Sequence, residues 1–411
     1  MRKTLSGAAC VAALAATTPG RAAPGDPVKV SDTFTIDPII DARLRYEAVN
    51  QNNANQEADA LTVRLRAGAE FKVPNLSLLI EGEGTLGLVN DYNAFPFAIE
   101  SDQRRPAYAV VPDPMNIELN RLQMQYKAGG LTLTGGRQRI SLDDQRWVGS
   151  VGWRQNEQTF DAMRGEAKLG PVALDASYGW SQRTIFGVDA GPRQGLAGDF
   201  VFAGAGVKAG PLNLKGFAYL LDYDEGFSLS NSSQTFGLRA TSSVPLATTG
   251  KLDIAASYAR QSDWRGNPAD YAADYIAADA ALGLNNLTVI AGYEKLGSDN
   301  GFAVQTPMAT LHKFNGWTDL FLTTPPAGLQ DAWLGAAHRF TGVKALPGLN
   351  AAITWHRFDS ALGGVNYGTE WDSSIGAKLG RVAVLAKYAD YAAKGFGTDT
   401  TKFWLQLEVA Y

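Results

Sequence analysis

The sequence of 411 residues contains a single cysteine, Cys10, which lies in an apolar N-terminal stretch. Once that stretch is removed, the chain can form neither disulfides nor thiolate metal sites. No run of 18 apolar residues occurs, which excludes a transmembrane helix. Charged residues make up only 19% of the chain, and a helical period is hard to find. These absences argue against a set of soluble domains.

Basic tails and catalytic motifs are also missing. The net charge is −4 with no basic patch, which excludes nucleic acid as a partner. Of three histidines, His338 and His356 are expected on adjacent strands, but neither has a convincing serine neighbour or a third metal ligand. No G-x-S-x-G motif is present. We therefore expect no enzyme, metal or cofactor, and an outer-membrane lipid hydrolase is only a remote alternative.

The N-terminus has the features of a secretory signal. Arg2 and Lys3 precede a short apolar core, and Ala22-Ala23 supplies small residues for cleavage. Pro24 is a poor residue after a cleaved bond, which leaves the cleavage site open. The expected division is a signal peptide (1–23), a short periplasmic segment (24–34) and one further domain (35–411).

From Thr35 onward, alternating runs are joined in turn by tight turns and long polar connections. Pro74-Asn75, Gly129-Gly130 and Gly170-Pro171 are examples of the tight turns. The count is about 18 strands, with 16 possible, and this asymmetry is typical of membrane barrels. The sequence thus predicts an all-β fold, a transmembrane antiparallel β-barrel with tight periplasmic turns and long extracellular loops. The last strand, which ends on Tyr411, resembles the signal that the barrel-assembly machinery of Gram-negative outer membranes reads.

The strand after Leu61 separates two faces. Its apolar side chains share one parity and its charged side chains the other. An arginine on the lipid face costs about 2–4 kcal/mol at midplane, so the charged set is expected to line the lumen. Arg66 and Glu83 should lie opposite each other across the Pro74-Asn75 turn. The same sorting places these residues inward: Arg43, Arg45, Arg64, Arg66, Glu83, Arg121, Arg164 and Lys168.

The strand after Gly130 breaks this sorting. Regular alternation would place Arg137 and Arg139 on the lipid face with Leu131 and Leu133. One extra residue reverses the parity, and glycine tolerates the backbone that a bulge requires. We therefore predict a β-bulge at Gly135-Gly136 that turns both arginines into the lumen.

The stretch from Gly135 to Asp161 carries a family resemblance. It reads GGRQRISLDDQRW, then GWRQNEQTFD, and it resembles the alginate-export family of outer-membrane barrels. The resemblance implies an 18-stranded barrel with an arginine-rich constriction. It marks Arg137, Arg139 and Arg164 as the first candidates for that constriction, with Arg45, Arg66 and Arg121 next. The candidates in the loop between the two strands are Asp143, Asp144, Arg146, Trp147 and Arg154.

The predicted function is a passive outer-membrane channel embedded in outer-membrane lipids. Arginine binds carboxylates through a planar fork, which favours anionic or hydroxyl-rich solutes such as uronic-acid saccharides or organic acids. A structural or adhesive barrel is the alternative, and the charges could instead be wetted lining held in internal salt bridges. The longest connection, Leu296–Gln330, is expected to fold over or into the mouth.

Overall fold

The computed structural model describes residues 26–246 and 250–411, so the predicted signal peptide lies outside the described residues. No helix in these ranges is both long and apolar enough to cross a membrane. The only helices found in them are three short 3-10 turns, η1 (Val188–Arg193), η2 (Leu229–Asn231) and η3 (Leu311–Lys313).

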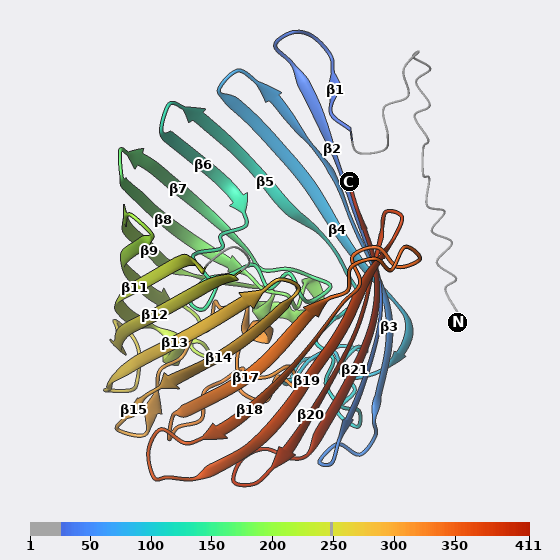
Figure 1. Cartoon of the computed structure of the whole chain (residues 1–411), viewed down its shortest axis with the longest axis vertical. Helices are drawn as coiled ribbons and strands as arrows, with labels where there is room; N and C mark the ends of the chain where they lie inside the picture. The colour runs from blue at the N-terminus through green and yellow to red at the C-terminus, as the bar shows by residue number, and fades with distance from the viewer. Residues whose placement is uncertain (1–25, 247–249) are drawn as a thin grey trace.

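Strands make up the wall of the molecule (Figure 1). Their bounds are β1 (Val28–Lys29), β2 (Thr35–Gln51), β3 (Ala58–Val73), β4 (Leu76–Asp91), β5 (Asn116–Ala128), β6 (Leu131–Gln138), β7 (Thr159–Leu169), β8 (Val172–Arg183), β9 (Gly195–Ala209), β10 (Leu212–Tyr223), β11 (Ser233–Leu246), β12 (Gly250–Asp263), β13 (Ala272–Leu284), β14 (Leu287–Leu296), β15 (Ser298–Asp299), β16 (Phe302–Ala303), β17 (Leu329–Arg339), β18 (Asn350–Asp359), β19 (Asn366–Leu379), β20 (Val382–Ala393) and β21 (Thr400–Ala410).

Eighteen of these strands form a closed antiparallel barrel, each paired with its neighbour in sequence. β2 closes the barrel against β21, in a register that runs from Asp41 opposite Ala410 to Gln51 opposite Thr400. β1 is a two-residue addition to the edge of β2, and β15 and β16 form a separate hairpin in a loop. The predicted fold class and strand number are confirmed.

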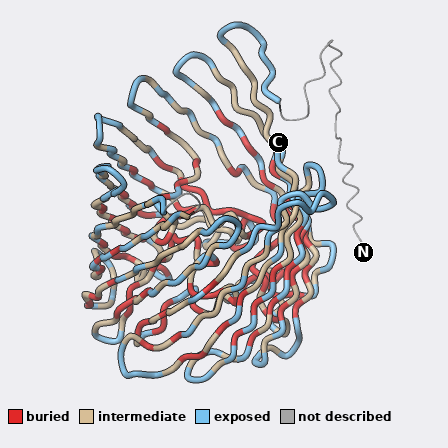
Figure 2. Tube along the Cα trace, viewed as in Figure 1, coloured by how far each residue is buried: buried red, intermediate tan, exposed pale blue. Residues whose placement is uncertain are grey.

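The two faces of the wall separate as predicted. On β3, Leu65 is 48% exposed while Arg64 beside it is fully buried. Figure 2 shows the same alternation of exposed and buried positions along many strands. Arg66 lies opposite Glu83 and forms an ion pair with it. The outward side chains are a nearly continuous apolar set, as lipid contact requires.

The predicted bulge at Gly135-Gly136 is wrong. β6 pairs with β5 and β7 in an unbroken register through both glycines. Gly136 does adopt a positive φ of 111°, and a Cβ there would overlap the carbonyl oxygen of Leu122, so the position requires glycine. The register shift occurs instead on β5, where Asn120 is the extra residue between the positions that face Glu81 and Gly82.

Arg137 therefore keeps the parity of Leu131 and Leu133 on the outer face. Its guanidinium binds Asp161 of β7 through two hydrogen bonds, of 2.7 and 2.9 Å. It also donates to the carbonyl of Leu119, next to the β5 bulge, at 3.1 Å. An arginine that faces outward is tolerated here because a carboxylate on the neighbouring strand neutralises it.

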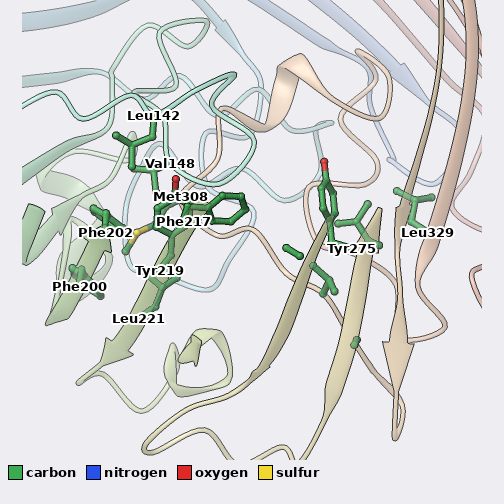
Figure 3. Close-up of a cluster of buried hydrophobic side chains, with 14 of the residues drawn as sticks. Leu142, Val148, Phe200, Phe202, Phe217, Tyr219, Leu221, Tyr275, Met308 and Leu329 are labelled. Carbon is green, nitrogen blue, oxygen red and sulfur yellow. The ribbon is translucent and has the colours of Figure 1, made fainter. Parts of the chain in front are cut away.

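Two long connections fold into the lumen and fill part of it. We call residues 139–158 the first inner loop and residues 297–328 the second. They meet at a short parallel bridge between Val148 and Met308. Around this bridge, inward aromatic side chains of β9 and β10 form a buried apolar core (Figure 3). Its labelled members include Leu142, Val148, Met308, Phe200, Phe202, Phe217 and Tyr219.

Candidate functional site

The first inner loop is fastened to the wall of β2, β3 and β4. Arg43 donates to the carbonyls of Gly152 and Trp153 at 3.1 and 3.0 Å. Gln155 donates to the hydroxyl of Thr62 at 2.8 Å. The two bonds from Arg43 satisfy backbone carbonyls that would otherwise lack a donor inside the barrel. The inward arginines of β2 thus have a structural task as well as a place in the lumen.

Two arginines of the first inner loop bridge it to distant strands. Arg146 forms an ion pair with Glu294 of β14 at 2.7 Å. Arg154 binds Glu47 of β2 at 3.1 Å and Asp319 of the second inner loop at 2.6 Å. Both side chains are almost fully buried. Although burial opposes the charge, the facing carboxylates raise the pKa of each arginine above its ordinary value.

The ion pairs along this wall differ in which partner reaches the lumen. The side chain of Arg139 is 33% exposed, whereas its partners Glu81 and Glu157 are only 1% and 2% exposed. Arg121 covers Glu81 in the same way. Here the buried carboxylates leave a positive surface toward the lumen.

The second inner loop is held by a different group, centred on Lys387 of β20. Its ammonium lies 4.0 Å from the ring centre of Trp153 and 3.5 Å from that of Trp317. Trp404 of β21 is the third ring, at 5.2 Å. No carboxylate forms an ion pair with Lys387 among the described residues, so the rings and His312 are its direct neighbours. We call Lys387, Trp153, Trp317, Trp404 and His312 the cage.

His312 is the last member of the cage, and its two hydrogen-bond partners determine the protonation of its ring. The ammonium of Lys387 lies 2.7 Å from its Nε2, which must accept, and its Nδ1 donates to Asp319 at 2.8 Å. Its ring stacks on Trp153 with centres 4.5 Å apart. Burial lowers the pKa of His312 well below its ordinary value.

Asp319 carries the negative charge of this group. Burial opposes its ionisation, yet the hydrogen bond from His312 and the cations Lys402 and Arg154 outweigh burial. They hold the pKa of Asp319 well below its usual range. The neutral ring of His312 thus lies between the ammonium of Lys387 and the carboxylate of Asp319.

Cavities lie around the inner loops among the described residues. A cavity of about 510 Å³ has Arg154, His312, Asp319 and Lys402 in its lining. A second, of about 310 Å³, is bounded by β11 to β19 and by residues 313–317. A third, also about 310 Å³, lies beside the turn at Gly130. Residues 317–319 contribute to the first two, so the second inner loop helps to divide the lumen.

The predicted site residues fall into four groups. Arg121 and the inward residues of β2 and β3 surround the first inner loop, which begins at Arg139. Arg164 and Lys168 line the third cavity. Arg137 is outside the lumen and must be removed from the proposed constriction. The loop candidates act as fasteners: Asp143 pairs with Lys215, Asp144 with Arg239, and Trp147 packs against Tyr275 with ring centres 5.0 Å apart.

Sequence reasoning did not find the cage. Its members come from the two inner loops and two C-terminal strands, and nothing in the spacing of Trp153, His312 and Lys387 links them. The prediction for Leu296–Gln330 is confirmed, because the loop folds inside and donates from Thr318 to Glu370 of β19 at 2.6 and 2.8 Å.

Comparisons with known proteins agree with this architecture. The alginate export family model matches residues 44–179, which confirms the resemblance over that part of the chain. No curated protein matches the sequence at a significant level. Solved structures, by contrast, match over almost the whole chain.

Three of these structures illustrate the likeness. OpdK of Pseudomonas aeruginosa, solved with vanillate, shares 15% identity, with 91% of this chain and 98% of that chain covered and a TM-score of 0.68. OccAB4 of Acinetobacter baumannii shares 12%, with 95% and 100% covered and a TM-score of 0.73. OccK2 of P. aeruginosa, in complex with glucuronate, shares 16%, with 91% and 98% covered and a TM-score of 0.66. At these identities the likeness shows the fold.

Proposed function

We propose that this alginate-export-type barrel is a passive outer-membrane channel for hydrophilic solutes, with a preference for anions such as uronic-acid saccharides or organic acids. A barrel of this strand number is wide enough for a water-filled passage. The inner loops narrow that passage and leave cavities of small-molecule size.

One observation carries the anion preference. At Arg121 and Arg139 the arginine reaches the lumen while Glu81 and Glu157 are hidden beneath it. A passing solute therefore meets the cation of each pair first, and a carboxylate can form the two parallel hydrogen bonds that a guanidinium offers. Complexes of similar barrels with vanillate and glucuronate fit the same class of solute.

Other pairs have the opposite order. Asp41 is 21% exposed against a buried Arg64, and Glu408 is 25% exposed against 8% for Arg43. These carboxylates lie on β2 and β21, toward the chain termini. The preference for anions then depends on the Arg121 and Arg139 group, which defines the experiment.

The test is the reversal potential of the purified protein in a planar bilayer under a potassium chloride gradient. We expect ion conductance with a reversal potential on the anion-selective side. Arg139→Gln should shift that potential toward zero, whereas Arg357→Gln, at an exposed pair outside the lumen, should not. Clear cation preference in the unmodified protein would overturn the anion proposal, and a silent protein would overturn the channel.

The membrane partners belong to the same proposal. The outward residues of β21, Phe403, Leu405 and Leu407, are 39–45% exposed and would contact outer-membrane lipid. During assembly the same strand, with Tyr411 after it, would be recognised by the barrel-assembly machinery. Deleting residues 403–411 should abolish insertion, as measured by protease sensitivity of the exported chain.

A further inference from the structure

The second cavity has an aromatic floor. Trp333 of β17 lies opposite Gly292 of β14, and a Cβ at position 292 would overlap the indole ring. The glycine thus lets the indole lie against the neighbouring strand. The ring remains partly exposed, and it lines the cavity. A flat, accessible indole of this kind is a stacking surface for another ring.

Hydrogen-bond acceptors surround this floor. Asp372 is only 1% exposed, and its Oδ1 has no hydrogen-bond partner among the described residues although it lines the cavity. Asp279 also lines the cavity, and no ion pair joins it to a described cation. The hydroxyl of Thr354 is a further polar group. The Oδ2 of Asp372 already accepts from the backbone N–H of Trp317 at 3.2 Å, so its Oδ1 is the open acceptor. A carboxylate oxygen without a donor is suited to a hydroxyl group of a ligand.

The lining also contains two cations. Arg239 of β11 forms an ion pair with Asp144 at 2.7 Å. Lys313 of the second inner loop is exposed and donates to the backbone carbonyl of Asp144 at 2.8 Å. No carboxylate forms an ion pair with Lys313 among the residues described, so its charge is available to a ligand. The cavity therefore combines a ring platform, acceptors for hydroxyl groups and an ammonium that has no carboxylate partner among the described residues.

We propose that this cavity is a binding subsite for a single sugar-acid ring, which stacks on Trp333, donates hydroxyl hydrogen bonds to Asp372 and Asp279, and places its carboxylate at Lys313. The inference rests on the proposed channel function and specifies its substrate class. An acid without a ring would use only Lys313, and a neutral sugar only the other groups. At about 310 Å³ the cavity is at the small end of the range for small-molecule sites, which suits one ring.

The side chains that line the cavity are held in place by hydrogen bonds and ion pairs, which indicates a preformed site. Asn315 of the second inner loop donates to Glu294 at 2.8 Å and accepts from Arg146 at 3.1 Å. His356 of β18 holds Asp331 at 2.9 Å. Tyr275, whose hydroxyl end points away from its strand in Figure 3, donates to Glu294 at 2.7 Å. These bonds fix the walls before any ligand enters, which reduces the entropy that binding costs.

The test measures block of the bilayer current by three probes: glucuronate, glucose and acetate. In the unmodified protein, glucuronate should block at a lower concentration than either of the others. Trp333→Ala should raise the half-blocking concentration of glucuronate and of glucose about 5-fold, the size of one ring contact, and leave acetate unchanged. Lys313→Met should weaken glucuronate about 5-fold and leave glucose unchanged.

Two matched controls remove a tryptophan and a lysine elsewhere. Trp180→Ala affects an outward ring on β8 that is 43% exposed, and Lys344→Met affects an exposed periplasmic connection. Both should leave the block unchanged. Trp333→Phe keeps a ring on the platform, and it should retain part of the glucuronate effect if Trp333→Ala fails to fold.

The failures of the two proposals can be told apart. A conducting channel whose glucuronate block is the same in Trp333→Phe, Lys313→Met and the unmodified protein would overturn the subsite and leave the channel standing. Glucuronate titration of tryptophan fluorescence in detergent tests the subsite without conductance. Saturable quenching that is weaker in Trp333→Phe would support the subsite, even if the protein conducts no current. Quenching of the same size in Trp333→Phe and the unmodified protein would overturn the subsite.

Discussion

The two inner loops are attached to the barrel by different chemistry. The first is held by arginines that bind carboxylates and backbone carbonyls, as Arg154 and Arg43 show. The second is held by cation–π contacts to Lys387 and by carboxylates of β19 that accept its backbone N–H groups. Removing one arginine leaves its buried carboxylates without a cation, whereas the cage spreads one charge over several rings. We therefore expect the first loop to be the more sensitive to single substitutions.

The sharpest way to break the first attachment is Arg154→Ala. The change leaves Glu47, Asp113 and Asp319 without their shared cation in a buried place. Breaking a buried pair costs about 3–5 kcal/mol, so we expect a loss of that size in a urea-unfolding experiment. Arg357→Ala, at an exposed pair that water screens, should leave the unfolding free energy nearly unchanged. Equal effects of the two changes would contradict the distinction.

Acid should weaken the second attachment. The pKa of His312 is lowered in the folded protein, so the unfolded chain binds more protons below its own value of about 6.5. Stability then falls as the pH drops from 6.5 to 5, by about 1.4 kcal/mol per unit for one proton. Asp319 does not contribute in this window. Because its pKa is lowered in the folded protein, the stability that its charge provides is lost only near or below the unfolded pKa of about 4.

The measurement is urea unfolding at several pH values. His312→Gln should flatten the slope between pH 6.5 and 5, and His338→Gln, at an exposed position, should leave it unchanged. A slope that survives His312→Gln would assign the acid sensitivity to another group.

Conductance measures how far the second inner loop, compared with the first, narrows the channel. Deleting residues 301–323 takes away the segment that divides two cavities, and we expect a several-fold rise in single-channel conductance. A deletion of residues 342–346, in an exposed connection, is the control. Unchanged conductance after the first deletion would mean that the first inner loop alone sets the narrowest point.

The smallest expected effect is at Arg137. In a chain without residues 1–23, and hence without cysteine, Arg139→Cys should react with a water-soluble thiol reagent and lower the current. Arg137→Cys should leave the current unchanged after the same treatment, because its side chain faces away from the lumen. A loss of current at both positions would mean that the side chain of residue 137 lines the channel.

The strand pattern was predictable because it depends on local alternation, which the membrane enforces at every residue. The parity of Leu65 and Arg64 follows from what lipid and water each accept. The bulge was misplaced because the same argument treated Arg137 as an isolated charge. Asp161 on the neighbouring strand removes the cost that the bulge was meant to avoid. A cross-strand partner is a tertiary fact that one strand's sequence does not contain.

The site was predictable only in part for a similar reason. The arginines were identified from their face of the strand, but their partners in the first inner loop depend on how that loop folds. Trp333 and Gly292 are unremarkable in isolation and become a platform only through the register of β14 and β17. The prediction that residues 296–330 fold over or into the mouth succeeded because loop length alone argued for it.

The seam between β2 and β21 has a consequence for assembly. Arg43 donates to Glu408, and Arg45 to Gln406, across a sequence separation of more than 360 residues. Contacts of such range form late, since a long stretch of chain must be ordered before they are gained. Until that moment the growing sheet has two open edges and two arginines without their final partners. Closure therefore completes the hydrogen bonding of the edges and the charge balance of the interior in one event, and a chain that ends before Thr400 can complete neither.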